Sequence, residues 1–301
     1  MKTVMAAAAS AAAAAAAAIL AYKAYLKSQL EAEKPENAKC DEYLCLPCAI
    51  DATFQKSLTP EDAVELLHEG VRRSTSGRKR AAPSRSTLLE NAAGGQWPYA
   101  AVLSCIDSRT PVEQIFDASI GDLFVARVAG NTATPDLIAS LEYATKYAGS
   151  KAILVLGHTK CGAVKGAWAG LRDGHLTDLL ARIQPAVDAT KAKFGGEATD
   201  ANINACAVAN VFETMSKLRS ASPIISGLEA EKKIALVGAV YDVASGEVLF
   251  LDEASADGKG RKVSSSPISI TAAHAFLAAT QPAEVKVDSK MKQWRFKAAM
   301  R

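Results

Sequence analysis

The chain has 301 residues, enough for one large domain or two small ones, and 49% of them are hydrophobic, which supports a buried core. Its 35 lysines and arginines against 32 aspartates and glutamates leave a net charge of +3, too small to indicate a nucleic-acid partner. Basic residues are not interleaved with aromatic ones in a stripe, and the most basic stretch, residues 72–85, is predicted to be a solvated loop. Six cysteines in a chain of this length do not make a disulfide scaffold and are typical of a reducing compartment.

Residues 1–30 are predicted to be a targeting or anchoring segment. From Val4 to Tyr22 the chain carries no charge and is mostly alanine, and Lys23 follows. An uncharged stretch of this length can span a bilayer, although alanine is only weakly apolar. A signal peptide, a transit peptide for a chloroplast or mitochondrion, and an uncleaved anchor that contacts a membrane through residues 3–22 all remain open.

The folded domain is expected over residues 59–281, between a linker at residues 31–58 and a basic tail at residues 282–301. The linker holds three clustered cysteines: Cys40, Cys45 and Cys48. This thiol cluster could bind a second metal or be redox-active, but it has no nearby fourth ligand.

Strands and helices alternate along the predicted domain. A helix is expected over residues 60–69, where Thr59 can cap the first turn and Pro60 occupies the first helical position. Short apolar runs predict four buried strands and one hairpin partner: residues 100–104, 123–128, 152–156, 234–240 and 247–251. Further helices are expected at residues 136–147, 176–193 and 204–219. This alternation predicts an α/β fold with a mostly parallel central sheet, helices on both faces and an antiparallel edge strand.

Residue types that bind metals follow two of these strands directly. Cys105 follows the first strand, and His158 and Cys161 follow the third. The carboxyl ends of parallel strands meet at one edge of a sheet, where functional groups gather. Two thiolates and an imidazole are a natural zinc set, and three protein ligands leave a fourth position for water, as in catalytic sites. An H-x-x-C pair alone arises often by chance, so the prediction depends on its combination with Cys105, Asp107 and Arg109.

These segments resemble the C-x-D-x-R and H-x-x-C signatures of the beta-class carbonic anhydrases. The resemblance covers about residues 59–252 and includes four further motifs: residues 121–131 (GDLFVARVAGN), 140–144 (SLEYA), 153–164 (ILVLGHTKCGAV) and 241–243 (YDV) with Gly246. It implies the family fold, including an N-terminal helical arm. It also implies a lyase that reversibly hydrates carbon dioxide to bicarbonate and a proton. One zinc ion per chain, held by Cys105, His158 and Cys161, would carry the attacking hydroxide.

The resemblance also implies roles for other residues. Asp107 would accept a hydrogen bond from the zinc hydroxide, and Arg109 would hold Asp107 away from the metal through a bidentate charged pair. Gln96 would reach a substrate oxygen from the partner subunit, because the pockets of this family are built at a dimer interface. The other positions that match the substrate pocket are Phe124, Ala129 and Gly162. A homodimer or a dimer of dimers is therefore expected.

Two other functions remain open at this level. Relatives on the same scaffold hydrolyse carbon disulfide or carbonyl sulfide with the same zinc ligands, but they would need restricted access to the pocket, and the sequence has no evident feature that restricts it. A non-catalytic, zinc-stabilised assembly protein is the second alternative. The Asp107–Arg109 pair and Gln96 argue against it, because a structural zinc site needs none of them.

Overall fold

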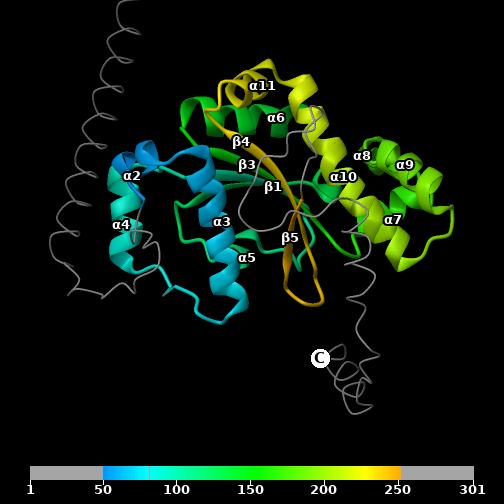
Figure 1. Cartoon of the computed structure of the whole chain (residues 1–301), viewed down its shortest axis with the longest axis horizontal. Helices are drawn as coiled ribbons and strands as arrows, with labels where there is room; N and C mark the ends of the chain where they lie inside the picture. Colours follow the sequence, from blue (N-terminus) through cyan, green and yellow to red (C-terminus); the bar gives the residue numbers. More distant parts are fainter. Residues whose placement is uncertain (1–49, 81, 252–301) are drawn as a thin grey trace, which may run out of the picture.

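The computed structural model describes residues 50–251 except residue 81 (Figure 1). The described strands form one five-stranded sheet in the order β2-β1-β3-β4-β5. The first four are parallel and β5 is antiparallel to β4. Their bounds are β1 Ala100–Ser104, β2 Leu123–Arg127, β3 Ala152–His158, β4 Ala235–Tyr241 and β5 Val248–Leu251. The predicted α/β class, the mostly parallel sheet and the antiparallel edge strand are confirmed.

Helices cover both faces of the sheet (Figure 1). Before β2 the described helices are α2 Ala52–Ser57, α3 Pro60–Thr75, α4 Arg85–Gly94 and α5 Val112–Ile115. Between β2 and β3 lie the short turns η1 Ala129–Asn131 and η2 Tyr143–Tyr147 and helix α6 Pro135–Glu142. After β3 come α7 Gly162–Trp168, α8 Gly174–Ala181, α9 Gln184–Phe194, α10 Asp200–Ala221 and α11 Pro223–Ala230.

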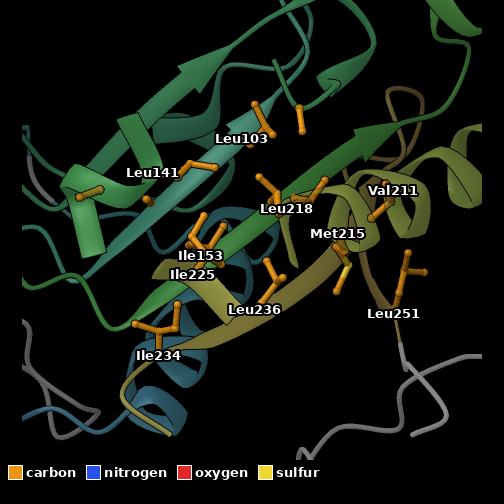
Figure 2. Packing of buried hydrophobic residues seen from close by; sticks show 14 of the residues in the cluster. Leu103, Leu141, Ile153, Val211, Met215, Leu218, Ile225, Ile234, Leu236 and Leu251 are labelled. Carbon is orange, nitrogen blue, oxygen red and sulfur yellow. The ribbon is translucent and has the colours of Figure 1, made fainter. Parts of the chain in front are cut away.

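Alternate side chains of the strands lie on opposite faces of the sheet and pack into two separate hydrophobic cores. On β3, Ile153 and Val155 pack with α6, α10 and α11, whereas Leu154 and Leu156 face the layer of α3 and α5. Figure 2 shows the first of these cores, in which the labelled side chains of the strands and of α10 converge. Strands that are buried on both faces have continuous apolar runs, which is why their positions were predictable.

Helix α10 lies close to the sheet because glycines on β3 and β4 make room for it. A Cβ atom on Gly157 would lie 2.7 Å from Val211 Cγ2, and one on Gly238 would lie 2.7 Å from Val211 Cγ1. Both approaches are shorter than a van der Waals contact. The missing side chains therefore set the depth at which α10 packs across the carboxyl halves of these strands.

Helix α3 begins as predicted, at a capping box. Thr59 Oγ1 accepts a hydrogen bond from the Asp62 backbone N–H at 3.1 Å, and Asp62 Oδ2 accepts one from the Thr59 N–H at 2.9 Å. The prediction of one helix over residues 176–193 was wrong. The segment forms α8 and α9, which are separated where Pro185 enters the first turn of α9, because proline has no N–H to donate to the preceding turn.

The basic stretch at residues 72–85 is not simply a solvated loop, which corrects the prediction. Arg73 Nε lies 2.6 Å from Asp117 Oδ2, and Arg80 pairs with the fully buried Asp122. Burial raises the pKa of Asp122, and the charge of Arg80 opposes that rise. These ion pairs attach the end of α3 and the residues after it to the segment that leads into β2.

The predicted linker also contributes to the fold at its end. Within α2, the buried Gln55 donates through Nε2 to the carbonyls of Pro98 and Ala148, each at 2.8 Å. The predicted targeting segment, the three clustered cysteines and the basic tail lie outside the described residues. Across residues 50–251, no helix has the length and apolar character needed to cross a membrane.

His68 is expected to make stability depend on pH. Its ring stacks on Phe250 with centroids 3.7 Å apart, and burial lowers its pKa from the ordinary 6.5. Below pH 6.5 the unfolded chain therefore binds a proton at this residue more readily than the folded one, so the free energy of unfolding falls as the pH decreases. Urea unfolding at pH 7.5 and 5.5 should show a smaller fall for His68→Phe than for the wild type. The same change at the exposed His175 should leave the fall unaltered.

Candidate metal site

Three candidate ligands meet at the carboxyl ends of β1 and β3. The two strands are parallel neighbours with Ser104 beside Leu156, so Cys105 and His158 reach the same edge of the sheet. Cys161 returns to that edge three residues later, at the start of α7. The side-chain atoms of the three residues that could bind a metal all lie within 4.8 Å of one another, and each residue is buried. The predicted combination of Cys105, His158 and Cys161 is therefore present in space.

The ring of His158 is oriented for a ligand at Nε2. Nδ1 lies 2.9 Å from the Thr159 carbonyl, and because a carbonyl oxygen only accepts, Nδ1 carries the proton. This leaves the Nε2 lone pair free. Nε2 is buried and has no hydrogen-bond partner among the described residues. Since a buried polar atom without a partner is costly, its position between two thiols fits a metal ion.

The two thiols hold negative charge unequally when no cation is present. Hydrogen bonds from the Cys161 thiol and, at 3.3 Å, from the Gly130 N–H lower the pKa of Cys105 below its ordinary value. The hydrogen bond with Cys105 in turn raises the pKa of Cys161, and burial and the negative charge of the Cys105 thiolate raise it further. A divalent cation removes this conflict by neutralising both thiolates.

Asp107 and Arg109 form the predicted bidentate pair beside the three ligands. Arg109 Nε donates to Asp107 Oδ1 at 2.9 Å, and Nη2 donates to Oδ2 at 2.7 Å. Arg109 thereby holds the pKa of Asp107 well below its usual range. Asp107 Oδ2 lies 3.9 Å from His158 Nε2, so this carboxylate is beside the ligand cluster but turned to the guanidinium. Two parallel charged hydrogen bonds fix the orientation of the Asp107 carboxylate and stabilise its negative charge.

Arg127 and Gly130 support Cys105, although sequence analysis gave them no role. Arg127 extends from β2 and donates to the carbonyls of Cys105 at 2.8 Å and Asp107 at 2.6 Å. Gly130 has φ of 71°, and a Cβ atom there would lie 2.6 Å from Ile183 Cδ1. Both belong to the RVAGN stretch that carried the family resemblance, which was the one signal available from the sequence.

Thr159 connects the His158 loop to the end of β4. Its hydroxyl donates to Asp242 Oδ1 at 3.2 Å and accepts from the Val243 N–H at 3.0 Å. Its own N–H donates to the Tyr241 carbonyl at 2.9 Å. The carbonyl that orients His158 is therefore part of a residue fixed at three points, and the YDV motif supplies that anchor.

The remaining predicted residues divide into two groups. Ala129 lies in η1 directly before Gly130, and Gly162 follows Cys161 with open space where a Cβ atom would lie. Gln96 and Phe124 lie instead at the amino ends of β1 and β2, the opposite edge of the sheet from the ligands. Because a five-residue strand spans roughly 16 Å, the fold of one chain does not bring Gln96 to its own metal cluster.

Phe124 borders an apolar groove of about 510 Å³ between β2 and the segment formed by α6 and η2. The groove is also lined by Ala101, Ala126, Leu137, Leu141 and Tyr143. None of the three candidate ligands lines this groove. Tyr143 is 55% exposed, so this part of the sheet edge presents an aromatic surface to the outside of the chain.

Comparison with known proteins identifies the same fold and family. The family profile described as carbonic anhydrase matches residues 100–248. Carbonic anhydrase 2 of Mycobacterium tuberculosis is 32% identical over 198 residues, which cover 64% of this chain and 93% of the relative. The structure of a Coccomyxa beta-carbonic anhydrase in complex with acetazolamide matches with a TM-score of 0.53 and 25% identity, covering 73% of this chain and 98% of that one.

A structure from a study of two tetrameric beta-carbonic anhydrases of Sordaria macrospora matches with a TM-score of 0.52 and 26% identity. It covers 59% of this chain and 89% of that one. With these relatives, the ligand cluster and the sheet topology, the chain belongs to the beta-carbonic anhydrase family. It is a lyase of the carbonic anhydrase type, which confirms the predicted enzyme class.

Proposed function

We propose that the chain binds one zinc ion through Cys105, His158 and Cys161 and uses it to hydrate carbon dioxide reversibly to bicarbonate and a proton. The observation that carries the proposal is the buried His158 Nε2, which has no hydrogen-bond partner in the described part of the chain and lies within 4.8 Å of both thiol sulfurs. Two thiolates and one neutral imidazole suit zinc and give a site without net charge. Bound zinc supplies a Lewis acid that lowers the pKa of a water molecule, which is the chemistry that this hydration requires.

Asp107 is proposed to orient the reacting water. Its Oδ2 atom faces the ligand cluster at 3.9 Å from His158 Nε2, within reach of a group in the fourth coordination position. Because its pKa is held low, Asp107 stays ionised and accepts hydrogen bonds without taking up a proton. Arg109 occupies both carboxylate oxygens and so keeps Asp107 from entering the position needed by the water.

Substrate contacts are proposed to come from a second copy of the chain. Gln96 is exposed at the amino end of β1, where its amide can donate to a substrate oxygen of a neighbouring chain. Phe124 and the groove beside it lie at the same edge and supply apolar surface, which suits uncharged carbon dioxide. A homodimer or a dimer of dimers is proposed accordingly, with Ala129 and Gly162 contributed by the chain that holds the metal.

Stopped-flow measurement of carbon dioxide hydration, with zinc content determined on the same sample, tests the proposed function. We expect about one zinc per chain and turnover in the usual range of enzymes, at or above about 1 per second. Bound zinc with no turnover between pH 7 and 9 would refute hydration. Turnover of carbonyl sulfide alone would move the assignment to a sulfur-analogue hydrolase, which the relatives found do not favour.

The partner's contribution can be tested by complementation. Gln96→Ala should lower kcat/KM about tenfold, because one substrate hydrogen bond is lost. In a mixed dimer, the Gln96→Ala chain keeps its metal site and the Cys161→Ser chain keeps its glutamine. The one metal site is therefore served by an intact glutamine only if Gln96 acts across the interface. Such dimers should therefore show half of the wild-type activity per dimer. Activity no higher than that of the Gln96→Ala chains alone would place Gln96 in its own chain's site.

A further inference from the structure

Lys160 lies between two metal ligands in a backbone conformation that is unusual for its residue type. Its φ is 55°, in the left-handed region that is unfavourable for a residue with a Cβ atom. The side chain does not explain this conformation. It is exposed, and within the described residues its Nζ atom forms one ion pair, at 4.0 Å, with the exposed Asp200. The backbone polar groups of Lys160, rather than its ammonium group, are therefore expected to contribute to the site.

Both polar groups of the Lys160 backbone have specific partners. Its N–H donates to Asn204 Oδ1 at 2.8 Å, and its carbonyl accepts from Arg109 Nη2 at 3.2 Å. The same Nη2 atom also donates to Asp107 Oδ2. The contacts form a continuous series from Asn204 through the Lys160 peptide and the guanidinium to the carboxylate.

Asn204 is well placed to act as the fixed end of this series. It is 4% exposed and lies in the first turns of α10, a helix of 22 residues whose start is capped by the Thr199 side chain. Helix α10 is packed tightly on the sheet through Gly157 and Gly238. A side chain on such an element changes position little, so its hydrogen bond can hold a strained peptide in place.

We propose that Asn204 is a positioning residue for the Asp107–Arg109 pair and acts by holding Lys160 in its left-handed conformation. This inference rests on the proposed function. When the Asn204 contact is absent, Lys160 relaxes toward negative φ and its carbonyl turns away from Arg109. The guanidinium then loses its third anchor, and Asp107 is no longer held at a constant position beside the ligand cluster. Zinc binding itself should persist, because none of the three ligands contacts Asn204 in the described hydrogen bonds.

The test uses the zinc-loaded full chain and five variants, one of them a control. Asn204→Ala removes the acceptor, whereas Asn204→Asp keeps an oxygen at the same place. Lys160→Gly removes the strain, since glycine adopts positive φ readily, and it is also combined with Asn204→Ala. Asn202→Ala serves as the matched control, because Asn202 is a buried amide on the same helix that donates to the Glu197 carbonyl at 2.9 Å, away from the site. Zinc content, kcat, KM and hydrogen exchange of the Lys160 amide are measured for each.

We expect Asn204→Ala to lower kcat about tenfold with KM and zinc content unchanged, and to speed exchange of the Lys160 amide at least about tenfold. Asn202→Ala should keep kcat within about twofold of the wild type. Asn204→Asp should retain slow exchange. The double variant should recover at least half of the loss on a logarithmic scale, because glycine holds the required conformation without help from Asn204. A purely structural defect in α10 would not be repaired by a glycine in another segment.

Three results would overturn the inference. They are wild-type exchange of the Lys160 amide in Asn204→Ala, an unchanged kcat in that variant, or a double variant no better than Asn204→Ala alone. A wild-type protein without turnover would refute the proposed function instead. In that case, exchange and zinc content would still decide whether Asn204 holds the Lys160 peptide.

Discussion

Cys161→Ser is expected to reduce the zinc content from about one per chain to less than about a tenth and to abolish carbon dioxide hydration. A serine hydroxyl is not ionised at neutral pH, so the variant offers only two good ligands and one thiolate charge. The remaining Cys105 and His158 supply one ligand fewer than the three that a catalytic zinc site needs. Metal analysis after dialysis against a weak chelator, followed by stopped-flow assay, measures both effects on one sample.

Cys206→Ser is the matched control for this loss. Cys206 is fully buried beside the same core as Cys105 and Cys161, and burial raises its pKa to about 11. It therefore stays a neutral thiol and is not among the three residues that could bind a metal. This variant should keep its zinc and most of its activity. Full zinc occupancy in Cys161→Ser, or equal losses in both variants, would contradict the assignment of the ligands.

Asp107→Asn is expected to lower kcat by about a hundredfold while zinc stays bound. The amide loses the charged bidentate pair with Arg109 and presents an NH₂ group that cannot accept a hydrogen bond from the reacting water. Arg109→Lys should also lower kcat, because an ammonium group cannot bind both carboxylate oxygens in the same plane and a freed Asp107 can compete for the metal. Steady-state hydration rates and zinc content on the same preparations measure these effects.

Asp200→Asn provides a control for the negative charge near this loop. Asp200 is exposed and lies 4.0 Å from Lys160 Nζ. It is therefore a carboxylate beside the same segment, and none of the described hydrogen bonds or ion pairs joins it to Asp107 or Arg109. The kcat of the Asp200→Asn variant should remain within about twofold of the wild type. A kcat for Asp107→Asn close to that of Asp200→Asn would show that Asp107 has no direct part in the reaction.

The residues that are proposed to bind and flank a metal could be singled out from the sequence because each follows a buried strand in a short motif. Cys105 and His158 end runs whose continuous apolar character predicts parallel strands, and the carboxyl ends of neighbouring parallel strands meet in any such fold. Asp107 and Arg109 are only two residues apart, so their pairing needs no long-range information. The first strand, residues 100–104, was predicted at its observed bounds for the same local reasons.

The supporting contacts were not predictable because they join distant segments through ordinary residue types. Nothing in the local sequence shows that Asn204 meets Lys160, since 44 residues separate them and the contact depends on how deeply α10 packs. Arg127 looks like any arginine at the end of a strand until its two carbonyl partners are placed. The pairing of Arg80 with Asp122 was missed similarly, because a run of basic residues is usually solvated.

Gln96 precedes β1 and Cys105 follows it, and this placement near opposite ends of the strand has a geometric consequence for assembly. A group at one end of a strand can serve a site at the other end only through a second molecule that is turned around. A twofold axis provides this rotation, and it does so for both molecules at once. Under the proposed assembly, the substrate-facing side chains of each chain would line the metal site of its neighbour, and the neighbour would contribute the same residues in turn. Two complete reaction centres would then exist only in the pair, and a single chain would contain two halves of different ones.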